Sequence, residues 1–111
     1  MSAHRRSRLV STIAREVARI LEFEVKDPAL RVALPTVMGV RLSPDREEAV
    51  VAVALQGVPT DQEKARAALV HDRGFIRAQL ARRLSVRRVP RLTFVVASPL
   101  GFPVPPREGD G

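Results

Sequence analysis

Apolar residues recur at three- and four-residue steps near the start of the chain. They are Val10, Ile13, Val17, Ile20 and Leu21. Charged residues keep the same period on the opposite side, and include Arg8, Arg15, Arg19, Glu22 and Lys26. This pattern predicts an amphipathic helix over about residues 7–25. The helix should end before Asp27-Pro28, because the residue before a proline avoids the helical region, and a loop should follow.

Two segments with a period of two come next, and that period is typical of strands. In residues 36–42, Met38, Val40 and Leu42 alternate with Val37, Gly39 and Arg41. Residues 49–55 alternate in the same way after the polar turn of residues 43–46. So short a turn predicts an antiparallel hairpin. A third strand is expected over residues 92–96, with its end at Ser98-Pro99.

A helical segment lies between the second and third strands. Thr60 and Glu63 have the spacing of a capping box, with Thr60 as the first cap residue. Gly74 interrupts the pattern, which indicates two helices that meet at a bend. We expect Gly74→Val to disturb that bend and lower stability. The order αββααβ predicts an α+β fold in which a three-stranded sheet packs against helices.

Length and composition narrow the possible functions. The 111 residues suffice for one domain, expected over residues 1–98, and the Pro- and Gly-rich residues 99–111 should form a flexible tail. The chain has no cysteine and only His4 and His71, so thiol chemistry and a His-rich metal cluster are not expected. No apolar run approaches a membrane span. The Arg- and Ser-rich start is superficially similar to a transit peptide, but it leads into a core-facing helix, which favours a cytoplasmic protein.

Basic residues outnumber acidic ones by 19 to 12, giving a net charge of +7. This excess predicts a polyanionic partner. Genome composition would explain arginine in place of lysine, but not the excess itself. The segment from residue 73 to residue 91 contains no acid and seven arginines: Arg73, Arg77, Arg82, Arg83, Arg87, Arg88 and Arg91. RNA phosphates would offset their mutual repulsion, whereas the alternative is a merely solvated face.

Other candidate features carry less weight. A second basic set on the first helix, diluted by nearby glutamates, consists of Arg5, Arg8, Arg15 and Arg19. The chain has no Trp or Tyr, and Phe23, Phe75 and Phe94 lie in or beside apolar stripes where core packing is expected. Recognition by base stacking is therefore disfavoured. The carboxylate pairs occupy a turn and a helix start, and no phosphate-binding glycine motif occurs, so we do not expect an enzyme.

The element order is that of type II KH domains, but the chain lacks their GxxG loop. The residues resemble those of the ribosome-binding factor A family across about residues 5–98. The resemblance rests on Val25-Lys26-Asp27-Pro28, Val40-Arg41-Leu42-Ser43-Pro44-Asp45, Gly74-Phe75-Ile76-Arg77, Arg83-Leu84, Arg87 and Val89-Pro90-Arg91-Leu92-Thr93-Phe94. It implies a KH-like domain with a helix–kink–helix in place of the GxxG loop.

The family's kink has the pattern Ala-x-Gly, and here Asp72, Arg73 and Gly74 match it except at the first position. Asp72 either caps the second helix or weakens a local RNA contact through its charge, and the cap is the preferred interpretation. The resemblance implies a monomeric, cofactor-free factor without a small-molecule substrate. Such a factor binds the immature 30S subunit and 16S rRNA, assists late maturation and matters for growth in the cold. A general RNA chaperone or single-strand binder, and a module that docks an acidic protein, remain the alternatives.

Overall fold

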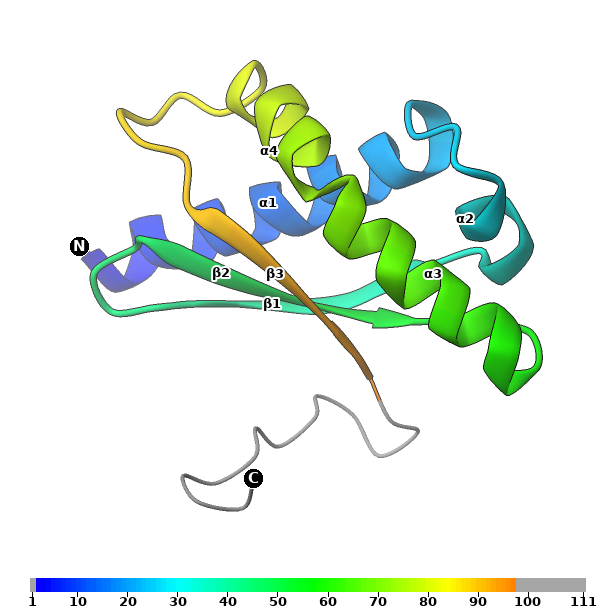
Figure 1. The fold of residues 1–111 in the computed structure, drawn as a ribbon. Coiled ribbons are helices and arrows are strands. Elements are labelled where there is room, and N and C mark those ends of the chain that lie inside the picture. Colours follow the sequence, from blue (N-terminus) through cyan, green and yellow to red (C-terminus); the bar gives the residue numbers. More distant parts are fainter. Residues whose placement is uncertain (1, 98–111) are drawn as a thin grey trace.

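The computed structural model describes residues 2–97 (Figure 1). In chain order the elements are α1 (Ser2–Phe23), α2 (Pro28–Ala33), β1 (Thr36–Leu42), β2 (Glu48–Ala54), α3 (Pro59–His71), α4 (Arg73–Ala81) and β3 (Arg91–Val96). The strands form one sheet in the order β1-β2-β3. The predicted α+β, KH-like fold is confirmed, with one short helix added. The predicted tail, 99–111, and the domain boundary at 98 lie outside the described residues.

Helix α1 begins earlier and ends sooner than its apolar stripe predicts. Arg6 holds the early turns in place, because its Nη2 donates to the carbonyl oxygens of Leu42 and Ser43, the latter at 2.7 Å. At the other end the amides of Glu24 and Val25 both donate to the Ile20 carbonyl oxygen, which closes the helix. The predicted inner face is confirmed, since its central residues are fully buried.

Helix α2 occupies a segment predicted to be a loop. Asp27 caps it, since its Oδ1 accepts a hydrogen bond from the Ala29 amide at 3.1 Å. Pro28 stands at the first helical position, where a missing amide hydrogen costs nothing. Asp27-Pro28 therefore ends one helix and begins another. Leu34 ends α2 in a left-handed conformation, with φ 46°.

The predicted hairpin is confirmed, and its first strand carries a β-bulge. Strands β1 and β2 pair antiparallel, with the register shifting between Val37 and Gly39. The shift lets both Val37 and Val40 pack against the core, whereas Met38 is 59% exposed. The predicted grouping of Met38 with Val40 is therefore wrong, because an inserted residue reverses the alternation on one side of it.

The start of α3 also differs from the sequence prediction. The helix begins at Pro59, so Thr60 lies inside the helix rather than capping it. The Asp61 carboxylate accepts from the Val58 amide at 3.4 Å, and Gln62 Nε2 donates to the Gly57 carbonyl oxygen at 2.9 Å. Side chains of the first turn thus bond backbone groups just before the helix. These bonds stabilise the start of α3, as the predicted capping box would have done.

Helices α1, α3 and α4 lie on one side of the sheet and enclose the core (Figure 1). The fully buried members of this core include Ile13, Val17, Ile20, Ala49, Val51, Val53, Ala65, Ile76 and Leu80. Strand β3 runs parallel to β2, and the α3–α4 pair makes the crossover that such pairing needs. The register sets Arg91 opposite Glu48. The start of β3 therefore lies beside the β1–β2 turn.

Candidate nucleic-acid interface

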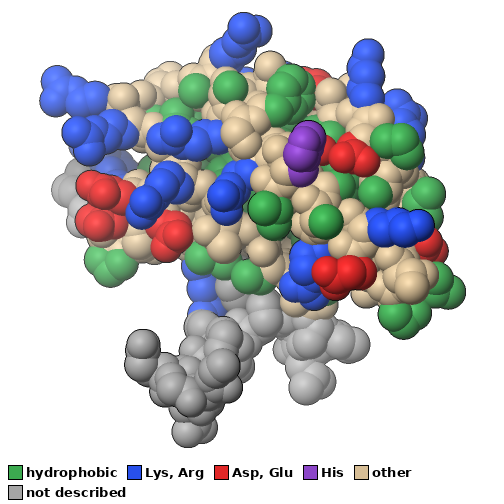
Figure 2. Space-filling model, viewed as in Figure 1, with side chains coloured by type: hydrophobic (Ala, Val, Ile, Leu, Met, Phe, Trp, Pro, Cys, Tyr) green, Lys and Arg blue, Asp and Glu red, His purple; other side chains and the backbone are tan. Residues whose placement is uncertain are grey.

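Five of the predicted arginines meet where α4, the segment after it and the start of β3 come together. Three adjoining depressions of about 520, 320 and 390 Å³ share Arg77 in their walls. We call the surface formed by the following residues the basic groove: Arg73, Arg77, Arg87, Arg88 and Arg91. Figure 2 shows blue side chains gathered over this part of the molecule. The fold thus brings together residues up to 18 positions apart in sequence.

Two arginines of the predicted set, Arg77 and Arg83, donate side-chain hydrogen bonds within residues 2–97. Arg77 donates from Nη2 to the Val89 carbonyl oxygen at 2.7 Å and from Nε to that of Pro90 at 3.2 Å. Arg83 pairs with Glu16 of α1 and with Glu24 just after that helix, since its Nε lies 3.4 Å from Glu16 and its Nη2 contacts Glu24. The charge of Arg83 is therefore largely compensated within the fold.

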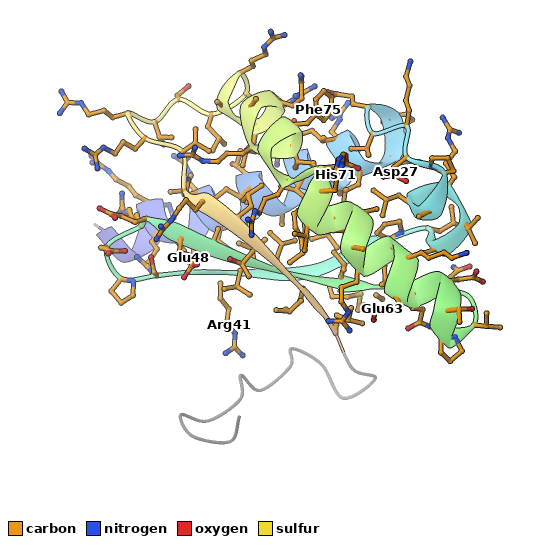
Figure 3. All side chains as sticks on the ribbon, viewed as in Figure 1. Asp27, Arg41, Glu48, Glu63, His71 and Phe75 are labelled. Atoms are coloured by element: carbon orange, nitrogen blue, oxygen red, sulfur yellow. The ribbon has the colours of Figure 1, made fainter. Side chains whose placement is uncertain are left out.

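The segment 73–91 contains no acidic residue, but the fold brings acidic residues from elsewhere in the chain close to it. Arg88 Nη1 lies 3.8 Å from the Glu47 carboxylate. Glu48 lines the same groove and accepts a hydrogen bond from Thr93 Oγ1 at 3.2 Å (Figure 3). These acids come from the end of the β1–β2 turn and the first residue of β2, which the parallel pairing of β2 with β3 brings beside the groove. The groove is therefore basic with an acidic rim.

Asp45 belongs to the same rim. Its Oδ1 accepts from the Ser43 hydroxyl at 2.6 Å and from the Glu47 amide at 3.0 Å. The Ser43 hydrogen bond, followed by the amide bond, holds the pKa of Asp45 below its ordinary value, because both stabilise the carboxylate. Asp45 therefore stays negatively charged at neutral pH. Arg46, the next residue, lines the same groove. The sequence did not indicate Arg46, because the β1–β2 turn is distant in sequence from the other arginines of the groove.

The arginines of α1 lie apart from the basic groove. Arg8 and Arg15 line a separate depression of about 480 Å³, together with Ser7, Ser11 and Thr12. Arg19 is exposed on the same helix, and Arg82 is exposed just after α4; neither lines these depressions. The predicted set therefore divides into one convergent group and separate exposed arginines.

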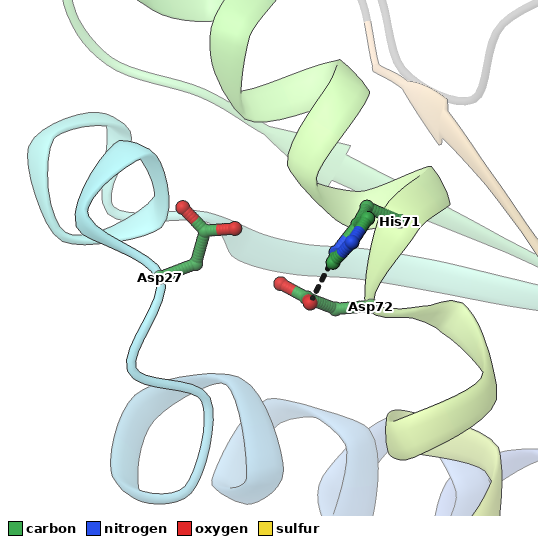
Figure 4. Close-up of side chains that lie close together, drawn as sticks. All are labelled: Asp27, His71 and Asp72. Carbon is green, nitrogen blue, oxygen red and sulfur yellow. Dashed lines mark hydrogen bonds and ion pairs between the residues drawn. The ribbon is translucent and has the colours of Figure 1, made fainter.

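The bend between α3 and α4 is at Asp72, as the kink pattern predicts, with φ −91° and ψ 4°. The Asp72 side chain makes no capping hydrogen bond to α4, so the preferred interpretation is wrong. Its Oδ1 lies 3.0 Å from His71 Nδ1, and its Oδ2 is buried without a hydrogen-bond partner (Figure 4). The side chain turns toward Asp27 instead of toward the start of α4.

The bend does not require a glycine at position 74 for steric reasons. A Cβ built at this position meets no atom within 4 Å, and the residue is an ordinary part of α4. The prediction that Gly74→Val disturbs the bend therefore has no steric basis. Gly74 instead lines two of the three depressions of the basic groove. The bare Cα lets a ligand approach the helix closely at that point.

Asp27, His71 and Asp72 are the one group in residues 2–97 with metal-ligand spacing, since one ligand atom from each lies within 4.8 Å of the others (Figure 4). Each already has a structural explanation. Asp27 caps α2, and His71 with Asp72 forms an exposed hydrogen-bonded pair across the bend. The group lies where α2 approaches the bend, and we assign no metal to it.

Two phenylalanines predicted to pack in the core are on the surface. Phe23 is 70% exposed at the end of α1, and Phe75 is 46% exposed on α4. Only Phe94 of the three packs against the core as predicted. The error arises because a residue at the edge of an apolar stripe can be either buried or exposed, and the periodicity does not decide which. The helices of residues 2–97 include none with the length and apolar character of a membrane span.

Comparison with known proteins identifies the family. The family model described as ribosome-binding factor A matches residues 5–98. Ribosome-binding factor A of Moorella thermoacetica is 40% identical over 90 residues, which cover 81% of this chain and 74% of that protein. The protein of the same name from Methylobacillus flagellatus is 45% identical over 92 residues, covering 82% and 70%.

Solved structures agree with this comparison. The crystal structure of ribosome-binding factor A from Thermus thermophilus has a TM-score of 0.72 and 35% identity, covering 84% of this chain and 98% of that one. A Thermus thermophilus homology model fitted into the cryo-EM map of a 30S complex has a TM-score of 0.65 and 32% identity, covering 78% and 88%. The chain belongs to the ribosome-binding factor A family.

Proposed function

We propose that the chain binds the 30S ribosomal subunit by laying the basic groove on 16S rRNA, and that it assists late maturation of that subunit. A Thermus thermophilus relative, 32% identical to this chain, has been fitted into a 30S complex, which supports the choice of partner. We infer from this function that the chain acts in the cytoplasm, and that slow RNA rearrangement at low temperature makes it important for growth in the cold.

The convergence of Arg73, Arg87, Arg88 and Arg91 around Arg77 is the observation that carries this proposal. Guanidinium groups donate two parallel hydrogen bonds to a phosphate, so arginines in one groove suit a nucleic-acid backbone. Gly74 adds a point of close approach in the same groove. Backbone charge and RNA shape, rather than base edges, are what such a surface reads.

The arginines outside the basic groove have different proposed roles. Arg8 and Arg15, beside the hydroxyls of Ser7 and Ser11, offer a second phosphate contact on α1. Exposed Arg19 and Arg82 add to the positive field around the contact. Arg83 stays paired with Glu16 and Glu24 and contributes structure rather than binding.

A charge-matched pair of double variants tests the groove. Arg87→Gln/Arg88→Gln and the control Arg31→Gln/Arg66→Gln each remove two positive charges, but the control sites lie outside the basic groove. We expect the first pair to reduce the magnitude of the log–log salt slope for 30S binding by about 1.4–1.8, the release expected for two phosphates. The control should keep the wild-type slope. Equal behaviour of the two pairs in co-sedimentation with purified 30S subunits would contradict the proposed groove.

The exposed rings of Phe23 and Phe75 favour one other function, single-stranded RNA binding by base stacking. Sedimentation of cell extract separates the two functions. A 30S assembly factor travels with free 30S particles and is scarce on 70S ribosomes, whereas a general RNA chaperone spreads over all RNA-containing fractions. A salt-independent interaction would instead indicate a protein partner.

A further inference from the structure

Arg77 is bonded to the polypeptide that leads into β3. Its two hydrogen bonds reach the carbonyl oxygens of Val89 and Pro90, twelve and thirteen residues further along the chain. Pro90 is buried and Val89 packs against the core. We propose that Arg77 is a positioning residue that fixes the segment 84–90, here called the basic loop, so that Arg87 and Arg88 face the RNA. This inference rests on the proposed function of the basic groove.

The other end of the basic loop is fixed as well. The Arg83 amide donates to the Leu80 carbonyl oxygen at 2.9 Å, and its guanidinium donates to the Gln79 carbonyl oxygen at 2.8 Å. Glu16 of α1 and Glu24, which directly follows that helix, hold the same guanidinium. At the β3 end, the Arg91 amide donates to the Glu47 carbonyl oxygen at 2.9 Å. Both ends are therefore anchored.

The middle of the basic loop depends on those anchors. Val86, Arg87 and Arg88 are exposed, and the pair of Arg88 with Glu47, at 3.8 Å, is long and solvated. Such a pair does not order two long side chains by itself. The direction in which Arg87 and Arg88 point is therefore set by the backbone that carries them, and Arg77 holds that backbone at Val89 and Pro90.

The chemistry of the contact separates positioning from charge. Two successive carbonyl oxygens need two donors in a fixed arrangement, which the planar guanidinium supplies. A lysine keeps the positive charge but carries its donors on one nitrogen at the end of a flexible chain. Arg77→Lys should therefore preserve any simple charge effect on RNA and lose the positioning.

Hydrogen exchange on the free protein gives the first test. In Arg77→Lys we expect the Arg91 amide, which donates to the Glu47 carbonyl oxygen at 2.9 Å directly after the anchored Pro90, to exchange about tenfold faster, because an anchoring contact is lost beside it. Amides of α1 and β2 should keep their rates. Arg31→Lys is the matched control, since Arg31 is exposed on α2, outside the basic groove, and makes no side-chain hydrogen bond among residues 2–97. Unchanged exchange of the Arg91 amide in Arg77→Lys would overturn the proposal.

Binding to purified 30S subunits gives the second test. Arg77→Lys should weaken binding as much as Arg77→Gln, to within about twofold, whereas Arg31→Lys should bind like wild type. In the Arg87→Gln/Arg88→Gln background, Arg77→Lys should lower 30S affinity by less than about a further twofold, because the effects of residues that act through one another are not additive. Wild-type affinity of Arg77→Lys, or full additivity, would refute the positioning role. If the wild type does not bind 30S subunits, but amide exchange beside the loop is accelerated in Arg77→Lys, the proposed function fails and the anchoring of the loop stands.

Discussion

Asp72 places a buried carboxylate oxygen, Oδ2, at the bend without a hydrogen-bond partner. A buried unsatisfied acceptor destabilises the folded state, more so when it is charged. The hydrogen bond that Asp72 does make, to His71, reaches a side chain that is 84% exposed. We expect Asp72→Ala to raise the free energy of unfolding by about 1 kcal/mol, which corresponds to a Tm increase of about 4–8 °C in a domain of this size.

His71→Ala is the control for this prediction. It removes the hydrogen-bonded pair but leaves the carboxylate, so its Tm should stay within about 2–4 °C of wild type, the shift for half a kcal/mol. A lower Tm for Asp72→Ala would mean that the carboxylate holds the bend together. It would also show that the departure from the family's Ala-x-Gly pattern is a stabilising one.

Gly74 allows a second prediction at the level of one residue. An added methyl group enters open space, and the backbone is helical, so Gly74→Ala mainly reduces the entropy of the unfolded chain. We expect the free energy of unfolding in urea to rise by about 0.5–1 kcal/mol. A decrease would show that the bend does need glycine. Binding of this variant to 30S subunits then reports separately whether RNA approaches the bare Cα.

Among the elements, those with a long hydrophobic period were predictable and those set by a few local contacts were not. The inner face of α1 and the hairpin follow from spacing alone. Helix α2 was missed because Asp27-Pro28 has two roles. It ends the preceding helix, and it also begins the next one, with Asp27 as the cap and Pro28 in the first turn. The bulge at Met38 was missed because nothing in an alternating sequence marks where one residue is inserted.

The cap of α2 can be tested directly. Asp27→Ala removes the acceptor for the Ala29 amide and should lower the free energy of unfolding by about 1 kcal/mol. Asp27→Asn keeps a good capping oxygen without the charge, so it should stay within a few tenths of a kcal/mol of wild type. Equal loss in both variants, measured by thermal unfolding, would show that the charge of Asp27 matters rather than the cap.

For the molecule as a whole, the sequence located the basic groove but not its electrostatic surroundings. The arginines from Arg73 to Arg91 were recognisable because they are close in sequence. Which of these arginines are bonded within the fold was not recognisable, since that depends on which guanidinium meets a carbonyl oxygen or a glutamate after folding. Asp45, Arg46 and Glu47 were missed for the same reason, because only the parallel pairing of β2 with β3 brings their turn to the groove.

The acidic rim leads to a prediction about the field of the whole protein. Glu47 is 57% exposed, and its side chain lies 3.8 Å from Arg88. Such a pair contributes little to stability, so Glu47→Gln should leave Tm unchanged. Removing the charge frees Arg88 and raises the potential of the groove. We expect 30S affinity to rise about two- to threefold at low salt, with the gain fading as salt screens the groove.

Glu63→Gln separates this local effect from net charge. Glu63 is 74% exposed on α3, where it pairs with Arg66 at 3.6 Å and lies away from the basic groove (Figure 3). Both variants raise the formal net charge from +7 by one unit. If only total charge guides the protein to RNA, the two will gain equally. If the groove is the contact, the gain belongs to Glu47→Gln, because over the distance to α3 the solvent and its ions screen the change.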